Sequence, residues 1–254
     1  MTPFPPLHRS DGPRPADTIE AERVHRMRMC ALGYRVFGAM RFGQIGDGHI
    51  SARDPELADH FWLLGYGVPF REATVDALVL VSPEGDVVRG SGDINIAAYN
   101  IHAPILAARP EAVSAAHTHT PYGTPFSAQA RLMEPISQEA CLFVFDQALF
   151  DDEELEVVST VGGARIAAAL GPNKLVILRN HGLLTVGETV EAAVGAFVVA
   201  ERVSEVHVKA GQDARPISME GAKQVAAHYT NQNLEWQVFQ WLVRDLAPDP
   251  NVVG

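Results

Sequence analysis

Two histidines stand two positions apart in the segment AAHTHTPYG, residues 115–123, at the end of an apolar stretch. We expect residues 112–118 to form a buried β-strand, on which residues i and i+2 point to the same face. His117 and His119 would then project side by side. Two imidazoles in this arrangement are suited to bind one divalent metal ion, which in the case of zinc requires nitrogen ligands at about 2.0–2.1 Å.

The segment RNHGLL, residues 179–184, is the expected source of a third metal ligand. His181 lies there between two apolar runs, and Gly182 allows a tight turn and a close approach of the backbone to a bound group. Paired histidines on a strand can also be core residues that donate to backbone carbonyls. The third histidine, in a strand–loop–strand context, favours the metal site over that alternative.

Glu139 is the best carboxylate candidate for proton transfer. It lies in PISQEACLF, residues 135–143, where a charged group beside an apolar segment must be paired, protonated or functional. A catalytic role and a structural salt bridge both stay open for this residue. The acidic run at 151–156 is typical of a solvated loop, and motifs of serine hydrolases, dinucleotide-binding folds and P-loops are absent.

Composition narrows the class of protein. The chain has 254 residues, of which 47% are hydrophobic and 20% charged, and its net charge is −11. This is typical of a globular protein and disfavours a nucleic-acid or anionic-membrane surface. Cys30 and Cys141 stand in apolar contexts and are expected to be buried thiols. A proline-rich start without an apolar signal core, and apolar runs too short for a bilayer, predict a cytoplasmic protein with no membrane partner.

The hydrophobic pattern predicts one α/β domain at residues 17–245, preceded by an extended proline-rich arm at 1–16 and followed by a flexible tail at 246–254. Helices are expected at 17–40, 95–108, 121–130, 160–170, 187–210 and 217–245. Strands are expected at 49–53, 60–64, 77–82, 86–90, 112–118, 141–145, 174–178 and 183–186. Helices would cover a mixed, largely antiparallel sheet.

These residues, in this order, resemble the class II aldolase and adducin head family from about residue 34 to residue 209. The matching segments are GHISAR (48–53), HAPILAARPEAVSAAHTHTPYG (102–123) and ILRNHGLLTVG (177–187). In that family the HxH and NHG histidines hold one catalytic divalent metal, which implies His117, His119 and His181 as its ligands. The resemblance also implies a three-layer α/β/α fold with a central mixed, mostly antiparallel sheet. Members are usually tetramers with active sites at subunit interfaces, and the aromatic segment EWQVFQWLV (235–243) fits a homotetramer.

The chain departs from the sugar-phosphate aldolases of this family at the residues that handle phosphate. Their Ser-Ser-Glu segment falls here on Ile96, Ala97 and Ala98, and the loop asparagine ahead of their S-x-R motif is here His49. The hydroxyl donors for a phosphate and the carboxylate acid/base are therefore missing, and a phosphate dianion would stay uncompensated. A phosphorylated sugar is a poor substrate for such a site.

The remaining residues suggest a different substrate. Glu139 lies close to the position of a catalytic tyrosine in the aldolases and is the candidate replacement for the missing acid/base. Arg53, His49, Asn180 and Ala98 are the predicted substrate contacts. A three-histidine metal site keeps open positions at which a small 2-oxo or 2-hydroxy carboxylate can chelate.

Three functions follow, of which the first is favoured. The start of the chain, from PPLHRSDGPRPAD through RMCALGYRVFGAMRFGQIGDGHISARDPE, resembles a branch of the family from aminocoumarin antibiotic biosynthesis. Those enzymes oxidatively decarboxylate a prenylated 4-hydroxyphenylpyruvate to a hydroxybenzoate, which implies a non-heme Fe(II) oxygenase that uses O2 on an aromatic 2-oxo or mandelate-type acid. The second function is a Zn(II) lyase, an aldolase or decarboxylase, for a non-phosphorylated 2-oxo or 2-hydroxy carboxylate. The third is a non-catalytic, adducin-like scaffold.

Overall fold

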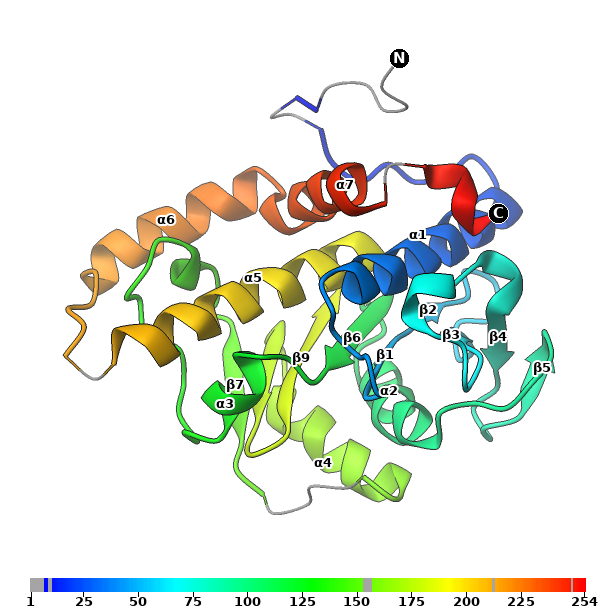
Figure 1. The fold of residues 1–254 in the computed structure, drawn as a ribbon, viewed down its shortest axis with the longest axis horizontal. Coiled ribbons are helices and arrows are strands. Elements are labelled where there is room, and N and C mark those ends of the chain that lie inside the picture. Colours follow the sequence, from blue (N-terminus) through cyan, green and yellow to red (C-terminus); the bar gives the residue numbers. More distant parts are fainter. Residues whose placement is uncertain (1–6, 9–10, 153–156, 212, 248) are drawn as a thin grey trace.

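A computed structural model describes residues 7–8, 11–152, 157–211, 213–247 and 249–254. A five-stranded sheet, in the order β1-β6-β9-β8-β7, lies next to a four-stranded sheet, β2-β3-β4-β5 (Figure 1). The strands are β1 (Gly48–Ile50), β2 (Ala52–Arg53), β3 (Phe61–Leu64), β4 (Leu78–Val81), β5 (Val87–Arg89), β6 (Ser114–Thr118), β7 (Gln147–Phe150), β8 (Leu175–Leu178) and β9 (Gly182–Gly187). β7 and β8 pair in parallel, and the other pairs are antiparallel.

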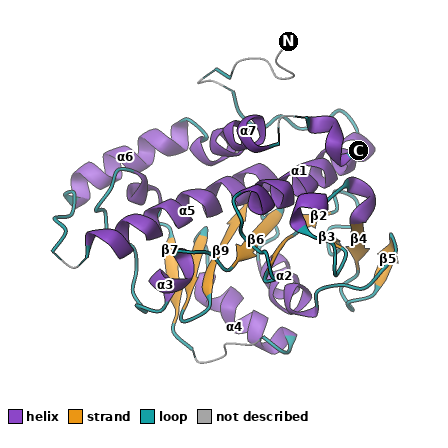
Figure 2. Cartoon of the chain, viewed as in Figure 1, coloured by secondary structure: helices purple, strands orange, loops and turns teal. Residues whose placement is uncertain are grey.

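Helices cover both faces of the five-stranded sheet, as Figure 2 shows. The helices are α1 (Ile19–Ala39), α2 (Ile96–Ala108), α3 (Gly123–Ser127), α4 (Thr160–Leu170), α5 (Val190–Ala210), α6 (Met219–Asn231) and α7 (Leu234–Leu246), with 3-10 turns at Phe70–Glu72, Val75–Ala77, Glu139–Leu142 and Pro250–Val253. α2 and α4 pack together on one face, while α5 and α1 cover the other and carry α7 outside them. The predicted three-layer α/β/α fold with a mixed, mostly antiparallel sheet is confirmed.

The side chains of the central strands explain why both faces need helices. Along β8, Leu175 and Ile177 belong to the core under α1 and α5, while Val176 and Leu178 belong to the core under α2 and α4. This alternation follows from the two-residue period of a strand, and a strand that is apolar on both faces must be covered on both. Among the described residues, no helix combines the length and the apolar character that crossing a lipid bilayer requires.

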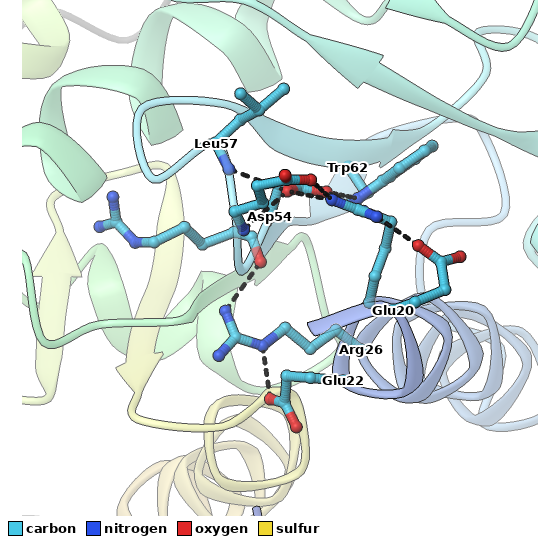
Figure 3. Close-up of polar contacts among 9 residues, drawn as sticks. Glu20, Glu22, Arg26, Asp54, Leu57 and Trp62 are labelled. Atoms are coloured by element: carbon cyan, nitrogen blue, oxygen red, sulfur yellow. Dashed lines mark hydrogen bonds and ion pairs between the residues drawn. The ribbon is translucent and has the colours of Figure 1, made fainter. Parts of the chain in front are cut away.

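A buried ion-pair cluster fastens α1 to the hairpin of β2 and β3 (Figure 3). The Arg23 guanidinium donates to both carboxylate oxygens of Asp54, with Nε–Oδ2 and Nη2–Oδ1 distances of 2.8 and 3.1 Å. Asp54, which is 0% exposed, also accepts from the indole of Trp62 and from the backbone N–H groups of Glu56 and Leu57. Asp54 directly follows β2, so the cluster holds the end of the β1–β2 segment against α1.

The segment 141–145 is not the strand that its apolar residues predict. Its first two residues, Cys141 and Leu142, belong to the 3-10 turn Glu139–Leu142, and Leu142 and Phe143 are buried in the core. The strand lies further along, at Gln147–Phe150. A short apolar run is compatible with a buried strand and with a buried turn, so its pattern alone does not decide between them.

The C-terminal region also differs from the predicted single helix at 217–245. The chain breaks between α6 and α7, where Asn233 adopts a left-handed conformation with φ of 49°. Asparagine adopts this conformation more readily than most residues, so the break does not require glycine. The predicted loose tail instead ends in the turn Pro250–Val253, with Val253 fully buried against the core. Much of the N-terminal arm, residues 1–6 and 9–10, and most of the acidic run, residues 153–156, lie outside the described residues.

Candidate metal centre

The structure brings the three histidines of the HxH and NHG motifs together. His117 lies on β6 and His119 directly after it, while His181 lies in the turn between β8 and β9. Because β6 and β9 pair antiparallel, with Thr118 opposite Leu183, that turn meets the end of β6. One nitrogen of each ring lies within 4.8 Å of a nitrogen of the other two. Three nitrogens at this separation fit around one divalent cation.

The turn that carries His181 is built from residues with special backbone conformations. Asn180 has a φ of 57°, and the N–H of His181 donates to the carbonyl of Leu178 at 2.9 Å, which closes the turn. Asn180 is exposed at the tip of this turn. Gly182 begins β9 against the rings, since a Cβ atom there would lie 3.5 Å from His117 and 3.9 Å from His119. Asn180 therefore shapes the loop that presents His181.

The rings of His117 and His181 are held in the neutral state that metal binding requires. Nδ1 of His117 lies 2.7 Å from the carbonyl oxygen of Leu183, so this nitrogen carries the proton and Nε2 keeps its lone pair. Burial, followed by the neighbouring His181 and His49 rings, holds the pKa of His117 well below its ordinary value. Burial and the neighbouring His119 lower the pKa of His181 to about 4. Neutral imidazoles are the form of histidine that ligates a divalent metal, so these rings are candidate metal ligands.

A second line of polar side chains stands behind the centre. His49 on β1 is paired across the sheet with His117, and their ring centroids are 4.9 Å apart. Nδ1 of His49 lies 2.7 Å from Nε2 of His102 on α2, whose Nδ1 lies 2.8 Å from the hydroxyl of Ser51. These groups are buried, and burial lowers the pKa of His102 to about 3. The line fixes the orientation of the His49 ring beside the metal centre.

A cavity of about 550 Å³ opens beside His49. The loops on either side of it lie at residues 42–49 and 63–72, and the N-terminal end of α2 closes it with Asn95 and Ala98. Two of the predicted substrate contacts, His49 and Ala98, therefore line one cavity. Arg71 is the cation among its lining residues, and it is exposed.

Arg53 does not reach this cavity. Its Nε donates to the carbonyl of Ala112 at 2.9 Å, and Nη2 donates to the carbonyls of Leu106 and Arg109 at 2.6 and 2.9 Å. Nη1 donates to a further carbonyl, that of Ala58. The guanidinium thus ties β2 to the end of α2, and within one subunit Arg53 contacts backbone carbonyls and not the cavity that His49 and Ala98 line. A motif position does not reveal which carbonyls surround a long side chain.

Glu139 lies in the 3-10 turn Glu139–Leu142 and forms an ion pair with Arg202 on α5, at 3.5 Å between carboxylate oxygen and Nε. Both side chains are partly exposed. Among the contacts between described residues, none joins Glu139 to one of the three clustered histidines. Within one subunit its surroundings are therefore those of a surface salt bridge, the alternative that its sequence context left open.

Two carboxylates near the centre were not identified from the sequence. Glu201 on α5 is 6% exposed and accepts from the hydroxyl of Thr120 and from the N–H groups of Tyr122 and Gly123, at 2.5, 3.0 and 2.6 Å. It thereby fixes the loop that follows His119. Asp47 lies directly before β1, with Oδ2 3.7 Å from Nδ1 of His119. The register of β1 against β6 makes this contact, and the sequence alone does not give that register.

Comparison with known proteins identifies the fold and its chemistry. Residues 28–208 match the class II aldolase and adducin N-terminal domain. The decarboxylase NovR of Streptomyces niveus is 37% identical over 93% of this chain and 89% of its own length. The 4-hydroxy-3-prenylphenylpyruvate oxygenase/4-hydroxy-3-prenylbenzoate synthase of Streptomyces roseochromogenus subsp. oscitans is 37% identical over 94% of this chain and 88% of its own.

Among solved structures, an L-fuculose 1-phosphate aldolase from Glaciozyma antarctica PI12 superposes with a TM-score of 0.80 at 34% identity, over 92% of this chain and 96% of that one. These relatives are decarboxylating, oxygenating and aldol-cleaving enzymes, and this chain is likewise an enzyme that cleaves carbon–carbon bonds. With its complete HxH and NHG histidines, it belongs to the class II aldolase and adducin N-terminal domain family.

Proposed function

We propose that this enzyme is a non-heme Fe(II) oxygenase that oxidatively decarboxylates a prenyl-substituted 4-hydroxyphenylpyruvate, or a related mandelate-type acid, to a hydroxybenzoate in antibiotic biosynthesis. The observation that carries the proposal is the position of the cavity: it adjoins the three-histidine cluster through His49 and has an alanine where the aldolases require a carboxylate. The two Streptomyces relatives, each matched over most of its length, support it.

The lining of the cavity suits an aromatic acid better than a sugar phosphate. Ala98 is fully buried and has no donor to offer a phosphate, while Leu63, Val68 and Phe70 contribute apolar surface. A phosphate dianion needs several charge-assisted hydrogen bonds to replace its hydration. A prenyl group and an aromatic ring gain instead from leaving water for such a wall.

The three histidines supply neutral nitrogen ligands and leave further coordination positions free. A bound Fe(II) ion would supply the redox chemistry with O2 and the polarisation of a chelating 2-oxo acid. The protein holds the ring of His117 through the Leu183 carbonyl and packs His49 between the cluster and the cavity. Buried rings around the reacting carbons also limit the access of bulk water, which protects reactive species.

The balance of the reaction requires an oxidant. A phenylpyruvate side chain has three carbons and a benzoate keeps one, so two carbons leave as CO2. The equation closes with two O2 consumed and one water formed for each substrate. The oxygen atoms of O2 end in the products, and the eight electrons come from the two cleaved carbon–carbon bonds and from the two C–H bonds of the methylene group. Dioxygen is therefore a co-substrate of the proposed reaction.

The test begins with protein purified without oxygen and loaded with Fe(II) or with Zn(II). We expect O2 uptake and CO2 release with 4-hydroxy-3-prenylphenylpyruvate from the Fe(II) protein alone, in the ratio that the balance requires. His181→Ala serves as the control that removes one ligand. Turnover by the Zn(II) protein without O2 uptake would contradict the oxygenase proposal.

A substitution in the cavity tests the substrate class separately. Ala98→Val narrows the wall next to His49, and we expect a higher KM for the prenylated acid with metal content unchanged. Ala97→Val adds the same two methyl groups one position earlier, outside the residues that line the cavity, and is the matched control. Equal KM values for the two variants would mean that the substrate does not bind in this cavity.

A lyase acting on a non-phosphorylated 2-oxo or 2-hydroxy carboxylate, with Zn(II), is the second candidate. The superposition on an aldolase at 34% identity favours it. It predicts metal-dependent release of an aldehyde or CO2 without O2 uptake. For either function we also propose a cytoplasmic homotetramer in which Glu139 contributes an acid/base group to a site completed by a neighbouring subunit. Sedimentation that finds a stable monomer at micromolar concentration would contradict the tetramer.

A further inference from the structure

Asp47 presents a carboxylate to the candidate metal centre without belonging to it. Its Oδ2 lies 3.7 Å from Nδ1 of His119, and its side chain is 20% exposed. Its Oδ1 is buried and has no hydrogen-bond partner among the described residues. Burying an unpaired carboxylate oxygen is costly, so a folded protein that does so needs a compensating interaction.

The backbone of the same segment holds this carboxylate in place. The carbonyl of Asp47 accepts from the N–H of His119 at 3.1 Å and from the hydroxyl of Thr118 at 3.0 Å. Gly48 permits the close approach, because a Cβ atom there would lie 2.4 Å from the side chain of Thr118. The loop before β1 is therefore clamped to the end of β6 on the side of His119 that carries Nδ1.

We propose that Asp47 is a positioning residue for the metal centre: its carboxylate accepts the Nδ1 proton of His119 and so directs the Nε2 lone pair of that ring to the metal. The inference rests on the three-histidine centre but on neither iron nor oxygenase chemistry. A carboxylate behind a ligating histidine fixes its tautomer and its ring orientation and raises its basicity.

The distance of 3.7 Å exceeds that of a hydrogen bond and lies within the range of an ion pair. Coordination of a cation at Nε2 withdraws electrons from the ring and makes Nδ1–H a stronger donor. The carboxylate is then attracted more strongly, and a small rotation of either side chain closes the gap. His117 has a neutral carbonyl in the equivalent position, so the two ligands of the HxH motif differ in the charge behind them.

Metal affinity is the first test, with Zn(II) alone as the probe and a competing chromogenic chelator as the readout. Asp47→Asn keeps the size of the side chain and removes its charge, and we expect the dissociation constant to rise on the order of 10- to 100-fold. Asp86→Asn removes one carboxylate from the exposed turn before β5 and controls for net charge. Equal affinities for these two variants would overturn the proposal.

A double-mutant cycle with His119→Ala separates positioning from a general attraction between Asp47 and the cation. Because His119→Ala retains no metal through dialysis, its weakened Zn(II) affinity is measured by titration with excess Zn(II). If Asp47 acts through His119, Asp47→Asn has no further effect on Zn(II) affinity once the ring is absent. The same loss in both backgrounds would show that the carboxylate acts on the ion directly, and the proposal would fail. Turnover is not measured in either arm, so failure of the proposed oxygenase function would be seen separately.

A third measurement uses the unaltered protein and does not depend on whether a variant folds. Nitrogen-15 NMR of the histidine side chains in the Zn(II) protein reports which ring nitrogen carries the proton. We expect the proton of His119 on Nδ1 and a resonance of a strongly hydrogen-bonded N–H. A proton on Nε2 would mean that Nδ1 binds the metal, which is incompatible with the assigned role of Asp47.

Discussion

Two buried polar clusters are joined by one short segment, residues 48–54, which contributes Asp54 to the first and His49 to the surroundings of the second. In the first, opposite charges meet: burial alone would raise the pKa of Asp54, but hydrogen bonds from Arg23 and from backbone N–H groups hold it well below its ordinary range. In the second, like rings meet, and burial together with neighbouring rings lowers the pKa of His117.

The difference distinguishes a cluster that stabilises the fold from a candidate for binding a metal ion. The carboxylate of Asp54 receives donors from α1, from its own loop and from Trp62, so its needs are met inside the chain. In the three clustered histidines, one nitrogen of each ring lies within 4.8 Å of a nitrogen of the other two, an arrangement that a bound cation would satisfy. Removing a group should therefore cost stability in the first cluster and metal affinity in the second.

The largest effects are expected from the histidines themselves. His117→Ala, His119→Ala and His181→Ala should each abolish metal retention, because a site with two neutral ligands loses more than the 10- to 100-fold typical of outer-shell residues. The proteins should stay folded, since each change removes one ring from a group of like rings and does not leave a buried charge unpaired. Metal analysis after dialysis checks this. A variant that keeps a full equivalent of metal would show that its residue is not a ligand.

The opposite pattern is expected for Asp54→Asn. This change leaves the guanidinium of Arg23 buried without its bidentate partner and should lower the free energy of unfolding by about 3–5 kcal/mol. Denaturant unfolding measures the loss, and metal content of the folded protein should be unchanged. Glu56→Gln, which alters an exposed partner of the same arginine, should cost less than about 1 kcal/mol. Similar losses for both variants would mean that burial does not distinguish them.

Glu139 and Arg202 form a third kind of charged pair, partly exposed and distant from both clusters in its contacts. If Glu139 serves as the acid/base of an assembled site, Glu139→Gln should retain metal and substrate affinity and lose on the order of 10²-fold in turnover. Arg202→Gln breaks the same ion pair and leaves the carboxylate, so it should change turnover little. Unchanged turnover in Glu139→Gln would mean that Glu139 has no catalytic role and only forms a surface salt bridge with Arg202.

The smallest expected effect is a difference in the pH dependence of stability. His102 has a pKa of about 3 in the folded metal-free protein, whereas an unfolded histidine takes up its proton near pH 6.5. The unfolded state binds more protons between these values, so the free energy of unfolding falls as the pH decreases below 6.5, by up to about 1.4 kcal/mol per pH unit for this site. The lowered pKa of Asp54 has the same sign but contributes only below about pH 4.

Unfolding curves of the metal-free protein at pH 7 and pH 5 test whether His102 causes the loss of stability in this range. His102→Gln should lessen the difference in stability between the two pH values, and Asp54→Asn should leave that difference unchanged. If Asp54→Asn reduces the pH dependence of stability in this range and His102→Gln does not, then the assignment of His102 to the range below pH 6.5 and of Asp54 to the range below pH 4 is wrong.

Patterns with a short period along the chain were sufficient to predict much of the structure and the centre of the site. The i and i+2 spacing placed His117 and His119 on one face, and the apolar runs at 174–178 and 183–186 gave strands on either side of His181. Caps and helical spacing located α1 and α2 within a few residues. These features depend on neighbours in sequence, so the sequence alone contains the information.

Contacts between distant segments were decided by the tertiary structure alone. The four carbonyls around Arg53 come from α2, from the loop after α2 and from the loop after β2, and no local pattern predicts that every nitrogen of the guanidinium donates to one of them. The apolar run at 141–145 begins in the 3-10 turn Glu139–Leu142, which packs against α5 and α6, and strand propensity does not reveal this packing. The antiparallel register of β1 and β6 sets His49 opposite His117 and Asp47 beside His119. A shift of β1 by one residue would turn its side chains, including that of His49, to the other face of the sheet, and the packing of both faces excludes it.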